Sequence, residues 1–308
     1  MARSIVDSHV HVWSDGTTFA QPDHADLAGL RGDASVQTLL GAMRAAQVDA
    51  AVLVQYIGYR WDNEYVAEAI KNRPDIFVGV CRIDPEDPLA PDHLTHWTKD
   101  RGFHGVRFSL QAHKTGDWLA GPLCDPLFLR ASDLNVPVLV LTKPSRLADL
   151  ATVLDRHPDL DIIIDHIADC EAENAEHVTL LKRLSLNPRV YIKTGHLWNL
   201  SSSGYPWQDQ FALIKLVRDL FGASRVMWGS DWSFCLKSAS YMQTLDFLQH
   251  EAAFLTSVEK DWIMGETARR LWKFPDRSGA RATLHRPEEG HEPMTLDSAS
   301  SRPMAQGT

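Results

Sequence analysis

The stretch "IVDSHVHVWSDG" (residues 5–16) begins as an apolar run and ends around two histidines. In an extended strand the side chains at positions i and i+2 point to the same face, so His9 and His11 would direct both imidazoles toward one point. A His-x-His pair also occurs by chance on surface strands, so its meaning depends on the rest of the chain. The stretch therefore predicts a first strand that ends at a candidate site.

Seven further apolar runs of strand length follow along the chain. Most are almost continuously apolar and rich in β-branched residues, which is typical of strands buried on both faces. The eight predicted strands are Ile5–His9, Ala50–Gln55, Ile76–Ile83, Gly105–Leu110, Val136–Leu141, Asp161–His166, Val190–Thr194 and Val226–Asp231.

Amphipathic, helix-like segments separate these runs, at residues 35–47, 63–75, 145–159 and 211–222 among others. Eight strands that alternate with helices in about 270 residues predict a single-domain α/β fold, a (β/α)8 TIM-like barrel. A doubly wound open sheet is the alternative, but no Gly-x-Gly-x-x-Gly follows the first run. We therefore expect the barrel.

The 308-residue chain is 44% hydrophobic and 23% charged, as in ordinary globular proteins. Its formal net charge is −9 and it has no long run of Lys or Arg, so we expect no nucleic acid partner. We see no secretory leader and no apolar run of about 20 residues, so we expect no membrane partner. Four well-separated cysteines predict no disulfide framework, which favours a cytoplasmic location. A homo-oligomer is compatible with the sequence.

The composition changes after Phe274. Residues 1–274 are predicted to form the barrel. Residues 275–308 are polar and rich in Pro, Gly and Ser, and almost free of large apolar side chains. Because such a segment buries too little apolar surface to offset its ordering entropy, we expect a disordered C-terminal tail.

Polar side chains lie at the end of most of the eight runs, where barrels of this type carry their chemistry. In chain order they are His9 and His11, Tyr56, Arg82, Arg107, Thr142, Asp165 and His166, Lys193, and Asp231. One such ending is ordinary, but repetition at the same end of many strands favours a functional site. Two of these residues have structural alternatives, because Asp165 could cap a helix and Lys193 could form a surface ion pair.

Several motifs resemble those of the amidohydrolase superfamily, in its amidohydrolase-2 branch. They are "DSHVHVW" (7–13), "IDHIAD" (164–169), "MWGSDW" (227–232) and "GETARRLWKF" (265–274). Two more, "FVGVCRIDPEDP" (77–88) and "FHGVRFSL" (103–110), resemble the dicarboxylate-lactone and sugar-lactone hydrolases of that branch. The resemblance implies the (β/α)8 barrel and a catalytic site made by His9, His11, His166 and Asp231.

The resemblance also raises the question of a metal. Many relatives bind a divalent metal through the His pair, a strand-five histidine and the strand-eight aspartate, and binuclear members add a strand-four lysine. Here Arg107 and Thr142 occupy the strand-four and strand-five positions, and a guanidinium is not a metal ligand. His9, His11 and Asp231 could still hold one zinc ion. Because a lost ligand weakens binding and the similar lactonases are metal-independent, we expect no obligatory metal and no other cofactor.

The implied activity is hydrolysis of a lactone of a carboxylated small molecule. Asp231 would activate water and later return the proton, while His9, His11 and His166 would polarise the ester carbonyl. Arg107 would hold the substrate carboxylate through its planar fork.

Further candidates for substrate binding are Tyr56, Arg82, Thr142, Lys193, Trp198 and Trp207. The tryptophans could form an apolar lid over the substrate, or could pack between the loops and the barrel. Two other functions stay open. One is a zinc-dependent non-oxidative decarboxylase of the same superfamily, and the remote one is a binding protein without catalytic activity.

Overall fold

The computed structural model describes residues 4–22, 33–109, 119 and 121–274. All eight predicted strands are confirmed, with slightly different ends. They are β1 (Val6–Val10), β2 (Ala50–Val54), β3 (Phe77–Cys81), β4 (Phe103–Ser109), β5 (Val138–Leu141), β6 (Ile162–Ile164), β7 (Val190–Lys193) and β8 (Val226–Met227). The predicted tail at 275–308 lies outside the described residues.

The strands form one parallel sheet in the order β1 to β8, so each strand pairs with the next one in the sequence. The segment that follows β8 closes this sheet against β1. The Ser8 N–H donates to the Trp228 carbonyl at 3.1 Å, and the Asp231 N–H donates to the His9 carbonyl at 3.0 Å. Parallel strands buried on both faces and joined by helical crossovers give the predicted single-domain (β/α)8 barrel.

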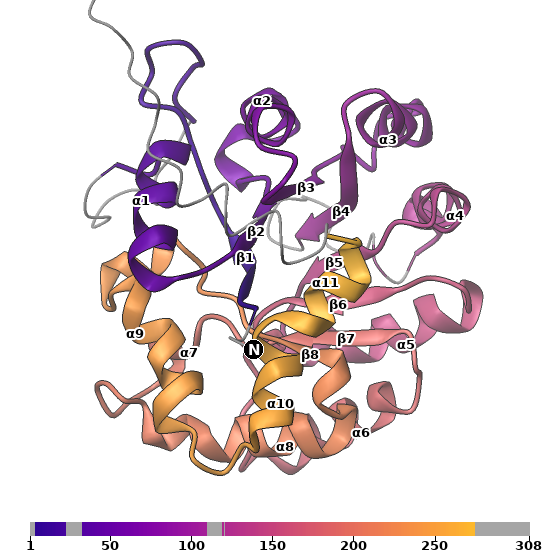
Figure 1. Cartoon of the computed structure of the whole chain (residues 1–308). Coiled ribbons are helices and arrows are strands. Elements are labelled where there is room, and N and C mark those ends of the chain that lie inside the picture. The colour runs from indigo at the N-terminus through magenta and orange to yellow at the C-terminus, as the bar shows by residue number, and fades with distance from the viewer. Residues whose placement is uncertain (1–3, 23–32, 110–118, 120, 275–308) are drawn as a thin grey trace, which may run out of the picture.

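Helices follow the strands and surround the sheet (Figure 1). They are α1 (Val36–Ala46), α2 (Glu64–Asn72), α3 (Ala90–Lys99), α4 (Asp125–Leu134), α5 (Leu147–Arg156), α6 (Ala175–Ser185), α7 (Leu197–Leu200), α8 (Phe211–Phe221), α9 (Tyr241–Asp246), α10 (Ser257–Asp261) and α11 (Thr267–Trp272). The four amphipathic segments of the sequence correspond to α1, α2, α5 and α8. None of the helices in the described ranges is long and apolar enough to cross a bilayer.

Two apolar layers hold the barrel together. The larger one lies between the strands and the helices, and the smaller one fills the barrel interior. The inner layer includes Val6, Val52 and Ile163 from the strands and Trp272 from α11. Since Val6 begins β1, α11 covers the amino-terminal end of the barrel, and the carboxyl-terminal strand ends are left to form the site.

Several strands end earlier than predicted, and in β6 and β8 the difference positions site residues. β6 ends at Ile164 and β8 ends at Met227, although the apolar runs continue to His166 and Asp231. His166 has φ = 54° and Asp231 has φ = 58°. A left-handed backbone cannot continue a strand, so the chain turns where the functional side chains begin.

Candidate active site

The histidine pair lies at the end of β1, and both rings are buried. The Nε2 atoms of His9 and His11 are 3.1 Å apart, so the two imidazoles converge as the i, i+2 spacing predicts. His11 Nδ1 lies 2.8 Å from the carbonyl oxygen of Val54. Because a carbonyl only accepts, His11 carries its proton on Nδ1, and its Nε2 lone pair faces the site.

His9 has the opposite tautomer. Its Nδ1 lies 3.2 Å from the Lys193 ammonium, which only donates hydrogen bonds. Asp165 Oδ1 also lies 3.3 Å from this Nδ1. Because His11 Nε2 carries a lone pair, the 3.1 Å contact between the two Nε2 atoms places the proton of neutral His9 on Nε2, which lies 3.9 Å from an Asp231 carboxylate oxygen. His9 thus presents a hydrogen-bond donor to the centre of the site.

A buried ion cluster holds Lys193 in place. Asp165 accepts a 2.8 Å hydrogen bond from Arg107 Nε, and its other oxygen lies 3.4 Å from Lys193 Nζ. Burial raises the pKa of Asp165, but Lys193, His9 and Arg107 outweigh it and hold that pKa well below the usual range. Burial lowers the pKa of Lys193 to about 8. Lys193 is buried, so its ion pair with Asp165 is not on the surface. Among the described residues, the partners of the Asp165 carboxylate are the side chains of Arg107, Lys193 and His9, not helix N–H groups.

Asp231 completes the centre from the turn after β8. One of its carboxylate oxygens lies 3.6 Å from His11 Nε2. Burial raises the pKa of Asp231 to about 7, against the opposing effect of His196 and Arg107. Near neutral pH this carboxyl group is populated in both protonation states, which suits a group that accepts a proton and returns it.

Asp7, which the sequence reasoning missed, fixes the turn that carries Asp231. It is fully buried in β1 and accepts hydrogen bonds from the Ser230 N–H at 2.9 Å, the Ser230 hydroxyl at 2.5 Å and the His9 N–H at 3.1 Å. Close backbone contact adds to this, because a Cβ on Gly229 would lie 2.8 Å from the His9 Cβ. A carboxylate inside an apolar strand was the available signal, since such a group needs buried partners.

His166 reaches the centre from an unusual turn. Residues 166–169 all have left-handed φ angles of 53–54°, and the His166 ring centroid lies 4.6 Å from that of His9. Four consecutive non-glycine residues in this conformation are strained and need a surrounding structure that enforces it. Gly195 makes room for the ring, because a Cβ there would lie 2.8 Å from His166 Nδ1.

His196 is a second residue that the sequence reasoning missed. It begins the loop after β7, its ring centroid lies 5.1 Å from that of His166, and its Nδ1 is 3.4 Å from Asp169 Oδ1. Burial lowers the pKa of His196, but the Asp169 hydrogen bond and the charges of Asp231 and Asp169 outweigh it and raise that pKa. In the sequence, the position of His196 shortly after a predicted strand end could have identified it as a site residue.

The other three histidines of the centre behave differently. Burial lowers the pKa of His9 to about 3 and lowers those of His11 and His166 well below the usual value. These imidazoles are therefore neutral at physiological pH. They can donate or accept hydrogen bonds but do not contribute positive charge.

The remaining predicted binding residues lie around this centre. Tyr56 is buried after β2, with its ring centroid 5.8 Å from that of His11. Arg82 and Thr142 are buried at the ends of β3 and β5, and the Thr142 hydroxyl has no hydrogen-bond partner in the described part of the chain.

The two predicted tryptophans occupy different environments. The ring centroid of Trp198 lies 4.9 Å from that of His196, next to the site. Trp207 instead contacts Phe247, with ring centroids 5.6 Å apart, and Tyr205 at 5.2 Å. Trp198 is therefore adjacent to His196, whereas the ring partners of Trp207 are other loop and helix aromatics.

The donor set fits a single divalent metal. Nitrogen atoms of His9 and His11 and a carboxylate oxygen of Asp231 all lie within 4.8 Å of one another. His11 has the arrangement usual for a metal-bound histidine, because its second nitrogen donates to a carbonyl. Three protein ligands with open positions are sufficient for a catalytic zinc. His9 would have to release its Nε2 proton to join them.

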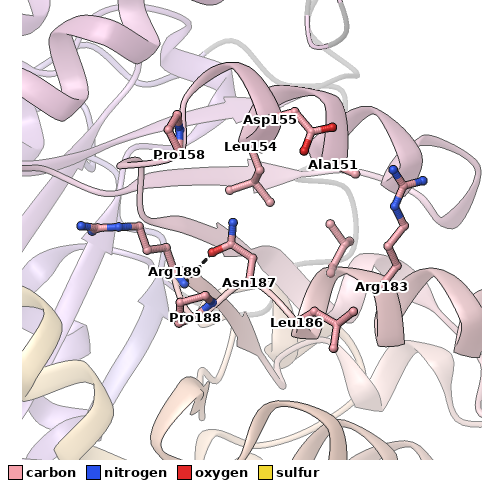
Figure 2. Close-up of a pocket in the computed structure, with 10 residues that line it drawn as sticks. Ala151, Leu154, Asp155, Pro158, Arg183, Leu186, Asn187, Pro188 and Arg189 are labelled. Carbon is pink, nitrogen blue, oxygen red and sulfur yellow. Dashed lines mark hydrogen bonds between the residues drawn. The ribbon is translucent and has the colours of Figure 1, made fainter.

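One surface hollow lies away from this centre. It is formed by the end of α5, the end of α6 and the loop before β7, and includes Leu154, Arg183 and Asn187 (Figure 2). The Arg189 N–H donates to the Asn187 side chain at 2.9 Å inside it. Because this loop enters β7, the hollow lies at the amino-terminal end of the strands, opposite the site.

Neutral histidines, an aspartate whose pKa is near 7 and a buried arginine converge at the carboxyl-terminal end of a (β/α)8 barrel. This combination is typical of the active site of a barrel enzyme. The chain belongs to the amidohydrolase family, whose family profile matches residues 6–274.

Individual relatives agree with this assignment. An L-fucono-1,5-lactonase from Burkholderia ambifaria is 29% identical over 237 residues, which cover 74% of this chain and 79% of that protein. A crystal structure described as a candidate 2-pyrone-4,6-dicarboxylic acid hydrolase from Pseudomonas putida is 26% identical, with a TM-score of 0.75 and coverage of 89% of this chain and 99% of that one. A zinc-bound amidohydrolase from Burkholderia multivorans shares the fold at 23% identity and a TM-score of 0.74, over 88% of this chain and 100% of that one.

Proposed function

We propose that this chain hydrolyses a lactone, a cyclic carboxylic ester, of a carboxylated small molecule. The names of the relatives support ester hydrolysis as the reaction. The observation that carries the proposal is the buried Asp231 carboxyl group, whose pKa of about 7 accompanies three converging neutral histidines. Such a group can remove a proton from water at neutral pH and donate it again later.

The reaction begins when the Asp231 carboxylate takes a proton from a water molecule that attacks the lactone carbonyl carbon. A new carbon–oxygen bond forms, and the carbonyl oxygen becomes an oxyanion. The His9 Nε2–H donates to this oxygen, and His166 supports it as a second donor. His11 accepts the His9 hydrogen bond in the free enzyme and keeps that ring oriented. Donors of this kind in a site sheltered from water contribute several kcal/mol each.

Collapse of the tetrahedral intermediate breaks the bond between the carbonyl carbon and the ring oxygen. Protonated Asp231 returns its proton to that oxygen, so the product is an open hydroxy acid and the base is regenerated. Arg107 binds the carboxylate of the substrate, while its Nε remains on Asp165. At neutral pH the new carboxylic acid releases one proton per turnover.

We propose that no metal is required. If one is bound, His9, His11 and Asp231 hold it, and it supplies Lewis acidity to the carbonyl or to water.

Proton release tests the function. Chelator-treated protein is mixed with a panel of carboxylated lactones, and release is followed with a pH indicator. Release from one lactone that chelation does not diminish supports metal-free hydrolysis. If proton release is absent and added zinc restores it, His9, His11 and Asp231 are metal ligands. Release of carbon dioxide from an aromatic acid would instead establish the decarboxylase alternative.

The Asp231→Asn variant separates an enzyme from a binding protein. The isosteric amide cannot act as a base, so turnover should collapse while circular dichroism shows an intact fold. Unchanged turnover in this variant would exclude the proposed base.

A further inference from the structure

Arg82 is an unusual residue for a protein interior. It directly follows β3, and its side chain is 1% exposed. Its backbone is fixed by Asn63, whose side-chain oxygen accepts from the Arg82 N–H at 2.8 Å and whose amide donates to the Arg82 carbonyl at 3.0 Å. The guanidinium carbon lies 5.3 Å from the centroid of the Trp61 ring. The backbone is therefore rigid and the head group is held against an aromatic face.

Two of the three guanidinium nitrogens lack hydrogen-bond partners among the described residues. Its Nε and Nη1 atoms are buried and bond to no acceptor among the described residues. No described carboxylate forms an ion pair with it, and Asp165 is already shared by Arg107 and Lys193. Burial and the charge of Arg107 lower the pKa of Arg82 to about 9. A buried cation without a counter-charge destabilises a fold, so an external anion is the partner that would relieve it.

Neighbouring strand ends add further unpaired polar atoms to the same sector. Gln55 Oε1 follows β2, Ser109 Oγ ends β4 and Thr142 Oγ1 follows β5, and all three are buried without a hydrogen-bond partner in the described ranges. Because strands pair in sequence order, β2 to β5 form one side of the barrel mouth. His9, His166 and Asp231 come from the ends of β1, β6 and β8. Gln55, Ser109 and Thr142 thus lie on other strands than the reacting groups, although His166 Nδ1 and Asp165 Oδ1 are also buried without a hydrogen-bond partner in the described ranges.

We propose that Arg82 forms an anion subsite, distinct from the Arg107–Asp165 pair, that binds an acidic group of the substrate and makes the enzyme selective for acidic over neutral lactones. The substrate class rests on the proposed function, whereas anion binding does not. A lactone held by this subsite would direct its acidic group toward β3 and its ester carbonyl toward Asp231. A neutral sugar lactone would leave the guanidinium unpaired.

Anion-dependent stability tests the subsite without turnover. The melting temperature of wild type and Arg82→Gln is measured in sodium malonate and in sodium chloride of equal ionic strength. We expect malonate to raise the melting temperature of wild type and not of Arg82→Gln, and Arg82→Lys to keep part of the response. In chloride, Arg82→Gln should melt at the wild-type temperature or above it, because an unpaired buried charge has been removed.

Arg101→Gln is the matched control. Its guanidinium also stacks on a tryptophan, 5.4 Å from the Trp97 ring, but it pairs with Glu64 and lies in the loop after α3. It should keep the full malonate response. The proposal is overturned if wild type shows no malonate response, or if Arg82→Gln melts lower in chloride and still responds, because Arg82 would then be a structural residue.

Kinetics supply the second arm. For an acidic lactone, loss of a charged hydrogen-bonding partner should raise KM about 10- to 100-fold in Arg82→Gln with a smaller change in kcat. Any turnover of a neutral lactone should be unaffected. If wild type hydrolyses no lactone while the malonate response depends on Arg82, the proposed function fails and the subsite stands. Preference for a neutral lactone would overturn the selectivity.

Discussion

The pH dependence of turnover follows directly from the environment of Asp231. Burial raises its pKa to about 7, and the proposed base must be ionised to activate water. At pH 5 only about one molecule in a hundred carries the ionised base, so kcat/KM should be about 100-fold below its plateau, with a slope of one per pH unit. His9, His11 and His166 add no inflection between pH 5 and 8, because burial keeps them neutral in that range.

The assay is kcat/KM on the identified lactone from pH 5 to 8.5, with chelated enzyme. Chelation matters because a zinc-bound water can also ionise near pH 7. Asp231→Asn should lose about 10²- to 10⁴-fold in activity, the usual contribution of a general base. A flat profile in chelated wild type, or a profile that survives in Asp231→Asn, would refute the role of this carboxylate.

The same pKa shift has a consequence for stability. The folded state holds the Asp231 proton more tightly than the unfolded chain, whose carboxyl group ionises near 3.8. The free energy of unfolding should therefore fall as pH rises from about 4 to about 7, and Asp231→Asn should remove this loss, which is up to about 4 kcal/mol. Urea unfolding at pH 4.5 and pH 8 measures the difference, and equal pH dependence in both proteins would contradict it.

Four further variants test the surroundings of the centre. Asp7→Asn should lower the free energy of unfolding by about 1–3 kcal/mol and reduce kcat, because its carboxylate accepts three hydrogen bonds that fix the turn before Asp231. Denaturant titration alongside kinetics measures both, and a wild-type kcat would count against this role. Lys193→Met should increase the affinity for zinc, measured by calorimetry. Without the lysine, His9 Nδ1 could donate its proton to the Asp165 carboxylate 3.3 Å away, which would leave Nε2 free to bind the metal. An unchanged zinc affinity would contradict the tautomer assigned to His9. Trp198→Ala should raise KM more than it lowers the melting temperature, whereas Trp207→Ala, which packs on aromatic neighbours, should lower the melting temperature more; the reverse pattern would exchange their roles.

Strand and helix positions were predictable because their signals are local. Apolar runs such as 50–55 and 136–141 are buried on both faces, and amphipathic segments such as 211–222 bury one face against the sheet. The turns were not predictable. The apolar character of 161–166 continues past the end of β6, and nothing in its composition indicates a left-handed turn at His166. That turn is enforced by packing, not by local preference.

By itself the sequence determined the eight-stranded barrel, the end of the barrel that carries chemistry and most of the side chains gathered there. Periodicity and the order of the motifs are enough for that, because parallel strands place their carboxyl ends together. Only the tertiary structure decided how those side chains are charged and oriented. Lys193 lies 184 positions from His9 and contacts its Nδ1, and Asp7 binds Ser230 across 223 positions. Such long-range contacts, together with burial, set the hydrogen-bond roles and the pKa values, and neither can be obtained from neighbours in the chain.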